Sequence, residues 1–319
     1  MNSTSFRRAF VPGIAALALA LSACGGADAG SDSGSEAGGA SGSVTIDGSS
    51  TVFPMSDAAA ELLNEENPNI NVSVSESGTG GGFERFCNGE TDISDASRPI
   101  EEDEVAVCEE NGIEFTELQV ATDALTVVVH PELDVDCLTV DQLKELWGPD
   151  STVSNWNELD PSFPDQEIAL FGPGTDSGTY DYLANDVIES ETEDTRSDYE
   201  SSEDDNVLVQ GVAGTPGATG YFGYTYYEQN ADSLKAVSID SGDGCVEPSA
   251  ETAQAGEYTP LARPLFIYVK DEAYADNEAV TEYVDYYIGN LEEIAEIGQF
   301  IPLSEDLYSE TQSNLEGMA

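Results

Sequence analysis

The chain has 319 residues, with 9 lysines and arginines against 64 aspartates and glutamates, and a formal net charge of -55 at pH 7. This balance excludes nucleic acid as a partner, because binding to a phosphate backbone requires clustered cations. Hydrophobic residues make up 39% of the chain, with 14 tyrosines and 11 phenylalanines, so a real core can form. The length favours about two domains, and the dispersed acids are typical of a solvated surface.

The first 23 residues are typical of an export signal. A pair of arginines precedes an apolar run from Val11 to Ala23, which is too short to span a bilayer. The tetrapeptide that ends at Cys24, LSAC, resembles the bacterial lipobox. We therefore expect a lipoprotein signal peptide over residues 1–23, with lipidation of Cys24. The alternative is an ordinary secretory signal with an incidental cysteine. Residues 24–42 are rich in Gly, Ser and Asp and predict a disordered tether.

Three segments each predict a strand, a turn of small residues and an amphipathic helix. Their strands cover residues 44–46, 70–74 and 168–171, and their turns are GSST, SGTGGG and GPGTDSGT. Small residues let a ligand approach the backbone, and the helix that follows begins with unpaired amides at the positive end of its dipole. Each turn is therefore a candidate anion site.

Hydroxyl groups in these turns can add hydrogen-bond donors, and they belong to Ser50, Thr51, Thr79, Ser177 and Thr179. The plainer reading is that tight turns simply use Gly and Ser. None of the turns matches the Walker A pattern or the GxGxxG spacing of a dinucleotide site.

A fourth candidate element is the turn at Ser97 and Arg98, directly before Pro99. A forked guanidinium is well shaped to hold an oxyanion. The alternative is that Arg98 only pairs with one of the many acids.

Four cysteines follow Cys24: Cys87, Cys108, Cys137 and Cys245. An even number in an exported chain predicts two disulfides, and the sequence permits three connectivities. No CxxC spacing occurs, and the single histidine, His130, is followed by a proline. We therefore expect neither a metal nor a cofactor.

Five motifs, in family order, make the chain resemble the PstS family of phosphate-binding proteins, the substrate-binding subunits of phosphate ABC transporters. They are DGSSTVFP (47–54), SGTGGGFERFCNGETDISDASRPI (77–100), LFGPGTDSGTYDY (170–182), SEDDNVLVQGV (202–212) and PGATGYFGY (216–224). The resemblance implies an α/β, two-lobed periplasmic-binding-protein fold of type II, with mixed sheets flanked by helices and the ligand in the cleft between the lobes. Periodicity alone predicts only an α/β chain.

The resemblance also implies a set of phosphate ligands. The positions that match the family's motifs are Ser50, Thr51, the amide of Val52, Thr79, the amide of Gly80, Ser177, Gly178 and Thr179. Better-known members place an arginine shortly before the SGT triplet, where this chain has Pro173-Gly174-Thr175, and an aspartate where it has Ser97. Because both changes fall together, we expect Arg98 to supply the positive charge.

The identity of a carboxylate acceptor is left open by the same departure. Hydrogen phosphate can donate a hydrogen bond to an ionised carboxylate, whereas sulfate cannot. Asp95 and Asp176 are the candidates, and Asp95 is slightly preferred.

The lobes implied by the resemblance are residues 43–125 with 262–319 for the first and 126–261 for the second. The chain then crosses between them near 122–125 and near 260–264, which would form the hinge. This division favours the pairings Cys87–Cys108 and Cys137–Cys245, because each then stays within one lobe.

We therefore expect an exported binding protein rather than an enzyme. It would be a monomer, lipid-anchored at the outer face of the cytoplasmic membrane or held in a periplasm. It would capture inorganic phosphate by hinge closure and deliver it to the permease subunits of an ABC transporter. Three alternatives remain: a receptor for sulfate or molybdate, a surface lipoprotein without a ligand, and a serine hydrolase that uses Ser177 with His130 as its base.

Overall fold

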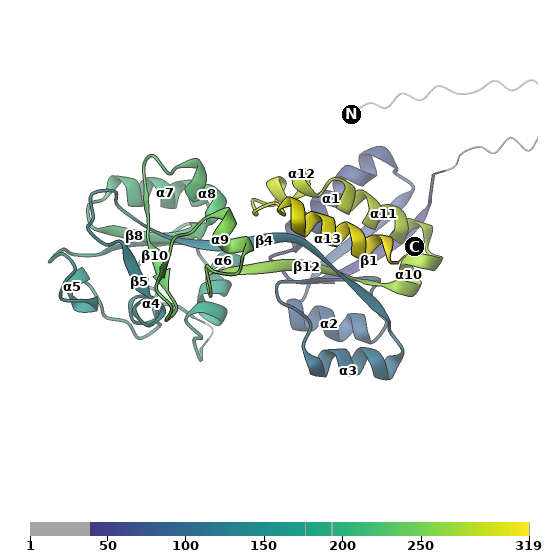
Figure 1. Ribbon diagram of the computed structural model, residues 1–319, viewed down its shortest axis with the longest axis horizontal. Helices are drawn as coiled ribbons and strands as arrows, with labels where there is room; N and C mark the ends of the chain where they lie inside the picture. The colour runs from purple at the N-terminus through teal and green to yellow at the C-terminus, as the bar shows by residue number, and fades with distance from the viewer. Residues whose placement is uncertain (1–38, 176, 193, 319) are drawn as a thin grey trace, which may run out of the picture. The chain divides into compact units, whose positions relative to one another are not determined.

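A computed structural model describes residues 39–175, 177–192 and 194–318, and these residues form a mixed α/β fold (Figure 1). The strands are β1 Gly42–Gly48, β2 Ile70–Glu76, β3 Ile93–Ala96, β4 Phe115–Val129, β5 Cys137–Thr139, β6 Ala169–Gly172, β7 Glu200–Ser201, β8 Ala218–Gly223, β9 Lys235–Ala236, β10 Ser238–Asp240, β11 Cys245–Val246 and β12 Ala262–Lys270.

The helices connect and flank these strands. They are α1 Phe53–Glu66, α2 Thr79–Cys87, α3 Glu102–Asn111, α4 Val140–Trp147, α5 Trp156–Leu159, α6 Gly178–Asp181, α7 Asp205–Gly214, α8 Tyr224–Gln229, α9 Ala250–Gln254, α10 Asp271–Asp276, α11 Glu278–Gly289, α12 Leu291–Ile297 and α13 Glu305–Glu316. A π-helical turn, η1 Tyr182–Val187, follows α6.

Most of the strands belong to one mixed sheet with the order β2-β1-β3-β12-β4-β8-β6-β7, and β9 pairs with β4. Strand β1 is parallel to β2 and β3, whereas β12 is antiparallel to both of its neighbours, β3 and β4. Strand β4 is long: its first part pairs with β12, and residues 125–129 pair with β8. A smaller sheet has the order β11-β10-β5. The α/β class with mixed sheets is the one expected.

The buried apolar residues gather in two large clusters. One draws on residues 44–121 and 265–295, and the other on residues 125–261. The chain passes between the clusters within β4 and at the start of β12, which run side by side in Figure 1. The two clusters divide the chain close to the predicted lobe boundaries. The lobes and the hinge between them stay predictions.

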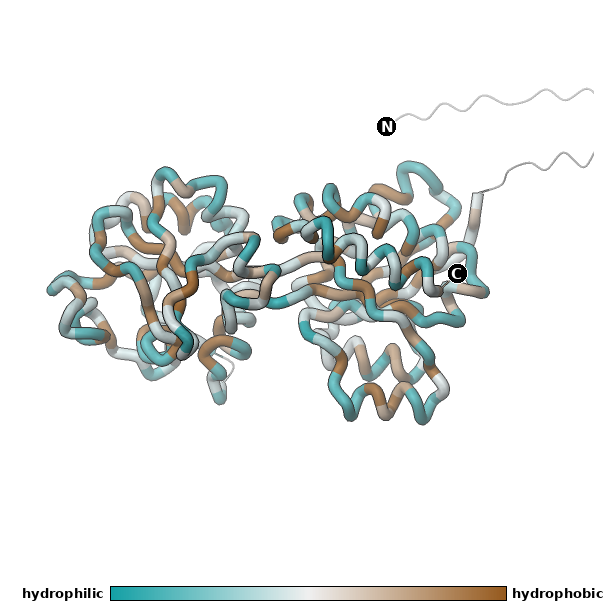
Figure 2. Tube along the Cα trace, in the orientation of Figure 1, coloured by the Kyte–Doolittle hydropathy of each residue, from teal (hydrophilic) through white to brown (hydrophobic). Residues whose placement is uncertain are grey.

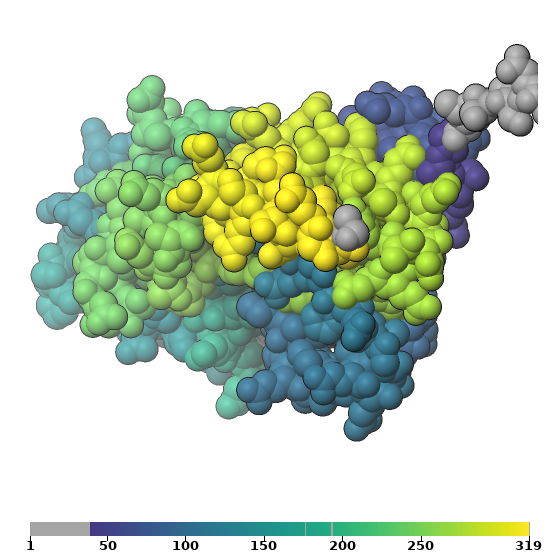
Figure 3. Space-filling model, turned by 45° about the vertical axis from the view of Figure 1, so that its right-hand side comes forward, coloured from purple at the N-terminus to yellow at the C-terminus, as the bar shows by residue number. Residues whose placement is uncertain are grey.

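The helices bury one face, as amphipathic sequences do. Helix α1 has Pro54 in its first turn, and it buries Met55, Ala59 and Leu63, which are spaced four residues apart on one side. Figure 2 shows hydrophilic and hydrophobic residues alternating along the outer helices. Thr311 of α13 donates a hydrogen bond to the Gln119 carbonyl of β4, and Figure 3 shows this C-terminal segment (yellow) on the surface.

The three predicted strand-turn-helix units are present, with one difference. The first two run from β1 into α1 and from β2 into α2. In the third, a single amphipathic helix was expected to follow the turn. The structure instead has the one-turn α6 and then η1, whose wider turn buries Tyr182 together with Leu183 and Val187.

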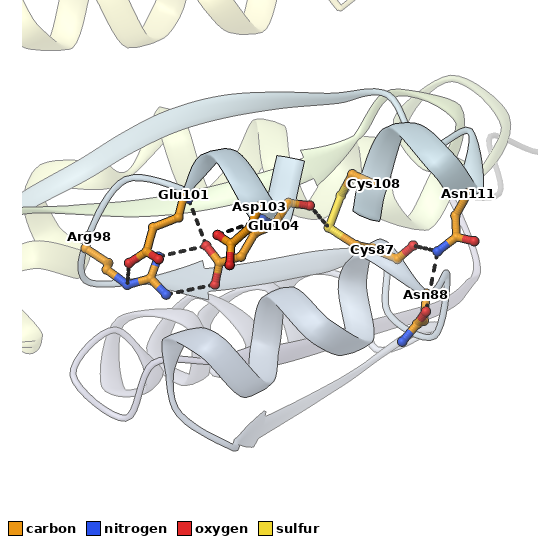
Figure 4. Close-up of a disulfide and its surroundings, with 8 residues drawn as sticks. All are labelled: Cys87, Asn88, Arg98, Glu101, Asp103, Glu104, Cys108 and Asn111. Carbon is orange, nitrogen blue, oxygen red and sulfur yellow. Dashed lines mark hydrogen bonds and ion pairs between the residues drawn. A yellow bond between two sulfur atoms is a disulfide. The ribbon is translucent and has the colours of Figure 1, made fainter. Parts of the chain in front are cut away.

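The disulfides have the connectivity favoured from the sequence. Cys87–Cys108 joins α2 to α3 with 4.2 Å between the Cα atoms, and Cys137–Cys245 joins β5 to β11 with 6.1 Å. Figure 4 shows the first of them.

Part of the sequence-based expectation lies outside the described residues: the signal peptide over residues 1–23, Cys24, residues 24–38 of the tether, and Asp176. Among the helices that are described, none has the length and apolar content that crossing a membrane requires.

The two disulfides close loops of very different length, and we predict that they differ in their contribution to stability. Cys137–Cys245 spans 108 residues and Cys87–Cys108 spans 21. Chain-entropy arguments give losses of about 5 and about 3 kcal/mol when each pair is replaced by alanines. Urea unfolding of the two double variants measures this. Equal losses, or a greater loss for the shorter loop, would contradict the prediction.

Candidate anion-binding site

The turns that carry the predicted ligands meet at one cavity of about 400 Å³. It is lined by Ser49, Ser50, Thr51, Gly78, Thr79, Ser97, Arg98, Gly178, Asp181, Tyr182, Asn185, Asp186, Thr259, Pro260, Ala262 and Arg263. The cavity therefore brings together the first turn, the second turn, the turn at Arg98 and the start of α6. These segments come from both predicted lobes.

The first turn follows β1 and is held by close backbone packing. Gly48 has φ 148°, and a Cβ there would lie 2.1 Å from the carbonyl oxygen of Asp95, so only glycine fits. The amide of Ser49 donates to that same oxygen at 2.9 Å. The Oγ1 of Thr51 accepts a hydrogen bond from Arg263 Nη2 at 3.1 Å, which leaves the hydroxyl hydrogen of Thr51 available as a donor.

The second turn is joined to the turn at Arg98. Thr79 Oγ1 and Ser97 Oγ lie 3.1 Å apart, and the amide of Ser97 donates to Thr79 Oγ1 at 3.2 Å. The two hydroxyls therefore form one polar pair at the cavity wall. Gly80 is exposed and does not line the cavity.

The third turn reaches the first through Gly178. A Cβ at Gly178 would lie 3.2 Å from Thr51 Oγ1, so this glycine permits the close approach of the two turns. Ser177 caps α6, and its Oγ accepts a hydrogen bond from the amide of Thr179 at 3.2 Å. Gly178 lines the cavity, whereas Ser177 and Thr179 are half-buried and do not line it.

Arg98 lines the cavity but is already paired with acids. Its two terminal nitrogens donate to the carboxylate of Glu104 at 2.8 and 2.7 Å, and its Nε lies 3.3 Å from Glu101 (Figure 4). The hydrogen bond with Glu104 raises the pKa of Arg98 further. The structure therefore shows the ion pairs of the alternative interpretation, and the role of Arg98 in holding an oxyanion stays a prediction.

Asp95, the preferred acceptor, is not at the cavity wall. Its side chain is fully buried, and Oδ1 accepts a hydrogen bond from Ser56 Oγ at 2.9 Å. Burial, reinforced by the nearby Asp47, raises the pKa of Asp95 to about 8, against the lowering effect of the Ser56 hydrogen bond. Asp95 is then mainly uncharged at pH 7, which argues against it as an ionised acceptor.

Val52 is another predicted ligand that the structure does not bring to the cavity. It is fully buried, and its amide donates to the carbonyl of Ser49 at 3.2 Å. The turn therefore uses this amide internally, as an ordinary reverse turn does.

The most notable residue that sequence reasoning missed is Arg263 of β12. Its side chain is only 13% exposed, and it lines the cavity with Tyr182 and Asp186, which the sequence also did not single out. One signal was present: Arg263 lies within the predicted hinge crossing at 260–264, in a chain with few cations.

The hydrolase reading has no support in the geometry. Ser177 Oγ is used to cap α6, and His130 Nδ1 accepts a hydrogen bond from the amide of Glu132 at 3.2 Å. No hydrogen bond joins Ser177 and His130 among the contacts of the described residues. Within the same part of the chain, no group of three or more His, Cys, Asp or Glu residues could hold a metal ion.

The structure combines a mixed sheet, two apolar cores joined by two chain crossings, and a cavity lined by hydroxyls and arginines. These are features of the solute-binding class of proteins. Residues 33–290 match the model of the PBP superfamily domain. The protein SphX of Synechococcus elongatus is 46% identical over 269 residues, which cover 83% of this chain and 79% of that protein. The phosphate-binding protein PstS of Staphylococcus saprophyticus is 38% identical over 300 residues, which cover 93% and 90%.

A solved structure shows the same architecture. The crystal structure of a possible phosphate binding protein from Planctomyces limnophilus superposes with a TM-score of 0.83 at 43% identity, covering 88% of this chain and 99% of that one. With these relatives and the superfamily match, the chain belongs to the PstS family of phosphate-binding proteins.

The buried Asp95 predicts a dependence of stability on pH. Because its pKa is raised from 3.8 to about 8 in the folded state, the folded protein holds a proton that the unfolded chain releases. Its contribution to stability is present below about pH 4 and is lost as pH rises to about 8. We expect Asp95→Asn to flatten this decline and, at pH values above 8, to have a higher Tm than the parent protein.

The control is Asp134→Asn at an exposed position. Melting curves from pH 5 to pH 9 provide the measurement. If Asp95→Asn and Asp134→Asn gave parallel curves, Asp95 would not be protonated in the folded protein.

Proposed function

We propose that this protein binds inorganic phosphate in the cavity between its two predicted lobes. The observation that carries the proposal is that Thr51, Thr79 and Gly178, from three separate turns, line one cavity together with two arginines. The names of its relatives support phosphate as the ligand. Ser50, Ser97 and Arg98 line the same cavity and would add donors.

The donors are suited to a small tetrahedral anion. Hydroxyl groups and arginine side chains can close around an oxyanion from several sides without a large net positive charge. Strands β4 and β12 are the two crossings between the clusters, so bending within them would open and close the cavity. Phosphate that contacts both sides would favour the closed form.

The closed form would then be recognised by the permease subunits of an ABC transporter. On this proposal, the lipid on Cys24 anchors the protein at the outer face of the cytoplasmic membrane, and residues 24–42 act as the tether. An anchor suits a protein this acidic, because anionic lipid headgroups repel it. The protein would act as a monomer and without a cofactor.

Calorimetric titration of the protein, freed of endogenous phosphate, tests the ligand. We expect binding of phosphate in preference to sulfate and molybdate. Because a hydrogen bond to a charged group contributes about 1.5–3 kcal/mol, Thr51→Val and Thr79→Val should each weaken phosphate binding by about 10-fold to 100-fold.

Thr45→Val is the matched control, since Thr45 is exposed on β1 and bonds to Asp92 outside the cavity. If the protein preferred sulfate or molybdate, that anion would take the place of phosphate as the proposed ligand. No binding of any of the three would favour a surface lipoprotein that has lost its ligand.

The association rate should rise when salt is added. The net charge of -55 repels phosphate at long range, whereas the cavity's hydrogen bonds act at about 3 Å. Between about 0.01 M and about 1 M salt the screening length falls from about 30 Å to about 3 Å. The long-range repulsion is therefore screened before the short hydrogen bonds of the cavity are weakened. Stopped-flow measurement over this range provides the check. A rate that is constant or falls with salt would show that local positive charge controls the encounter.

A further inference from the structure

The guanidinium of Arg263 is shared among three partners at the cavity. Its Nε lies 3.2 Å from Asp123 Oδ2, and its Nη1 donates to Asp186 Oδ2 at 2.8 Å. Its Nη2 donates to Thr51 Oγ1 at 3.1 Å. The side that carries Nη1 and Nη2 therefore contacts one acid and one predicted phosphate ligand.

The plane of the guanidinium is fixed by Tyr182. The ring centroid of Tyr182 lies 3.7 Å from Arg263 Cζ, a stacked arrangement that attracts the cation. Tyr182 is buried, and its hydroxyl donates to the carbonyl of Pro260 at 2.7 Å. Arg263 therefore cannot swing out of the cavity without losing this packing.

The two acids that contact Arg263 differ in how easily each ion pair can be broken. The side chain of Asp123 is 11% exposed, and it lies opposite Arg263 in the ladder between β4 and β12. Separating this pair would leave a buried charge without its partner, which is costly. The side chain of Asp186 is 54% exposed, so water can take over its solvation when the ion pair breaks.

The acid that pairs with Arg98 is less easily replaced by an anion. Both of its terminal nitrogens donate to the carboxylate of Glu104, which is 17% exposed. A two-bond pair with a mostly buried carboxylate is harder to displace than a single bond to an exposed one. Of the two arginines at this cavity, Arg263 is therefore the better group to receive an anion.

We propose that Arg263 binds phosphate directly through Nη1 and Nη2, and that the ligand takes the place of the Asp186 carboxylate as the partner of Nη1. This inference rests on the proposed phosphate binding. Asp123 remains in place and holds the guanidinium. Asp186 then competes with the ligand for Arg263 and lowers the affinity of the protein for phosphate.

The first test removes the cation. Arg263→Gln should weaken phosphate binding by at least about tenfold in calorimetry, because a charge-assisted hydrogen bond is lost. Lys144→Gln is the matched control, since it removes one positive charge from an exposed pair with Glu189 and should leave the affinity unchanged. Wild-type affinity in Arg263→Gln, with normal binding by the parent protein, would overturn this inference and leave the proposed function standing.

The second test removes the competitor and does not depend on the stability of Arg263→Gln, whose buried Asp123 is left unpaired. Asp186→Asn should bind phosphate about two- to fivefold more tightly, as expected for loss of an exposed ion pair. Glu189→Gln, at an exposed acid three residues further along the chain, is the control for the long-range effect of one charge. The test is whether the phosphate affinity of Asp186→Asn rises by more than the phosphate affinity of Glu189→Gln.

The double variant Arg263→Gln/Asp186→Asn completes the cycle. In the absence of Arg263, removal of Asp186 should give no gain beyond that of Glu189→Gln. An equal gain in both backgrounds would show that Asp186 acts only by repulsion. Weaker phosphate binding by Asp186→Asn, with sulfate binding unchanged, would show that Asp186 accepts the phosphate proton. Either result overturns the proposed displacement. Absence of phosphate binding in the parent protein would instead overturn the proposed function.

Discussion

The antiparallel pairing of β4 with β12 is the constraint on which the rest of the structure depends. These strands connect the two apolar clusters, and their register sets Arg263 opposite Asp123. The pair lies at the cavity, where Arg263 also contacts Thr51 of the first turn. A register shift of one residue would turn Arg263 to the other face of the sheet. The ladder therefore fixes both the course of the chain between the two apolar clusters and the position of a cation.

The acidic composition and the proposed anion ligand are compatible because they act over different distances. The net charge of -55 is spread over a solvated surface, where salt screens it within about 8 Å. The cavity is lined by hydroxyls and by Arg98 and Arg263, each of which has an acidic partner. Such a site relies on oriented hydrogen-bond donors, and its two arginines are held in place by Glu104 and Asp123.

The turns at the cavity could be predicted from the sequence, whereas the contacts of Arg263 and the burial of Asp95 could not. The turns at Thr51, Thr79 and Gly178 carry short-range signals of small residues between a strand and a helix, and the structure brings all three to the cavity. The role of Arg263 depends on Asp123, 140 residues away in the sequence, so no local pattern marks it. The burial of Asp95 likewise depends on packing between β3 and α1, which a count of acids cannot reveal.

The place of β12 in the sheet also sets the order in which the fold can be assembled. This strand lies between β3 and β4, although it comes after residue 261 in the sequence. The residues up to the end of β8 therefore include the two strands that flank β12 but not the strand that joins them. The first apolar cluster has to wait for distant residues, and such late, long-range closure makes folding slow. The apolar cluster of residues 44–121 is therefore completed only when residues 265–295 pack against it.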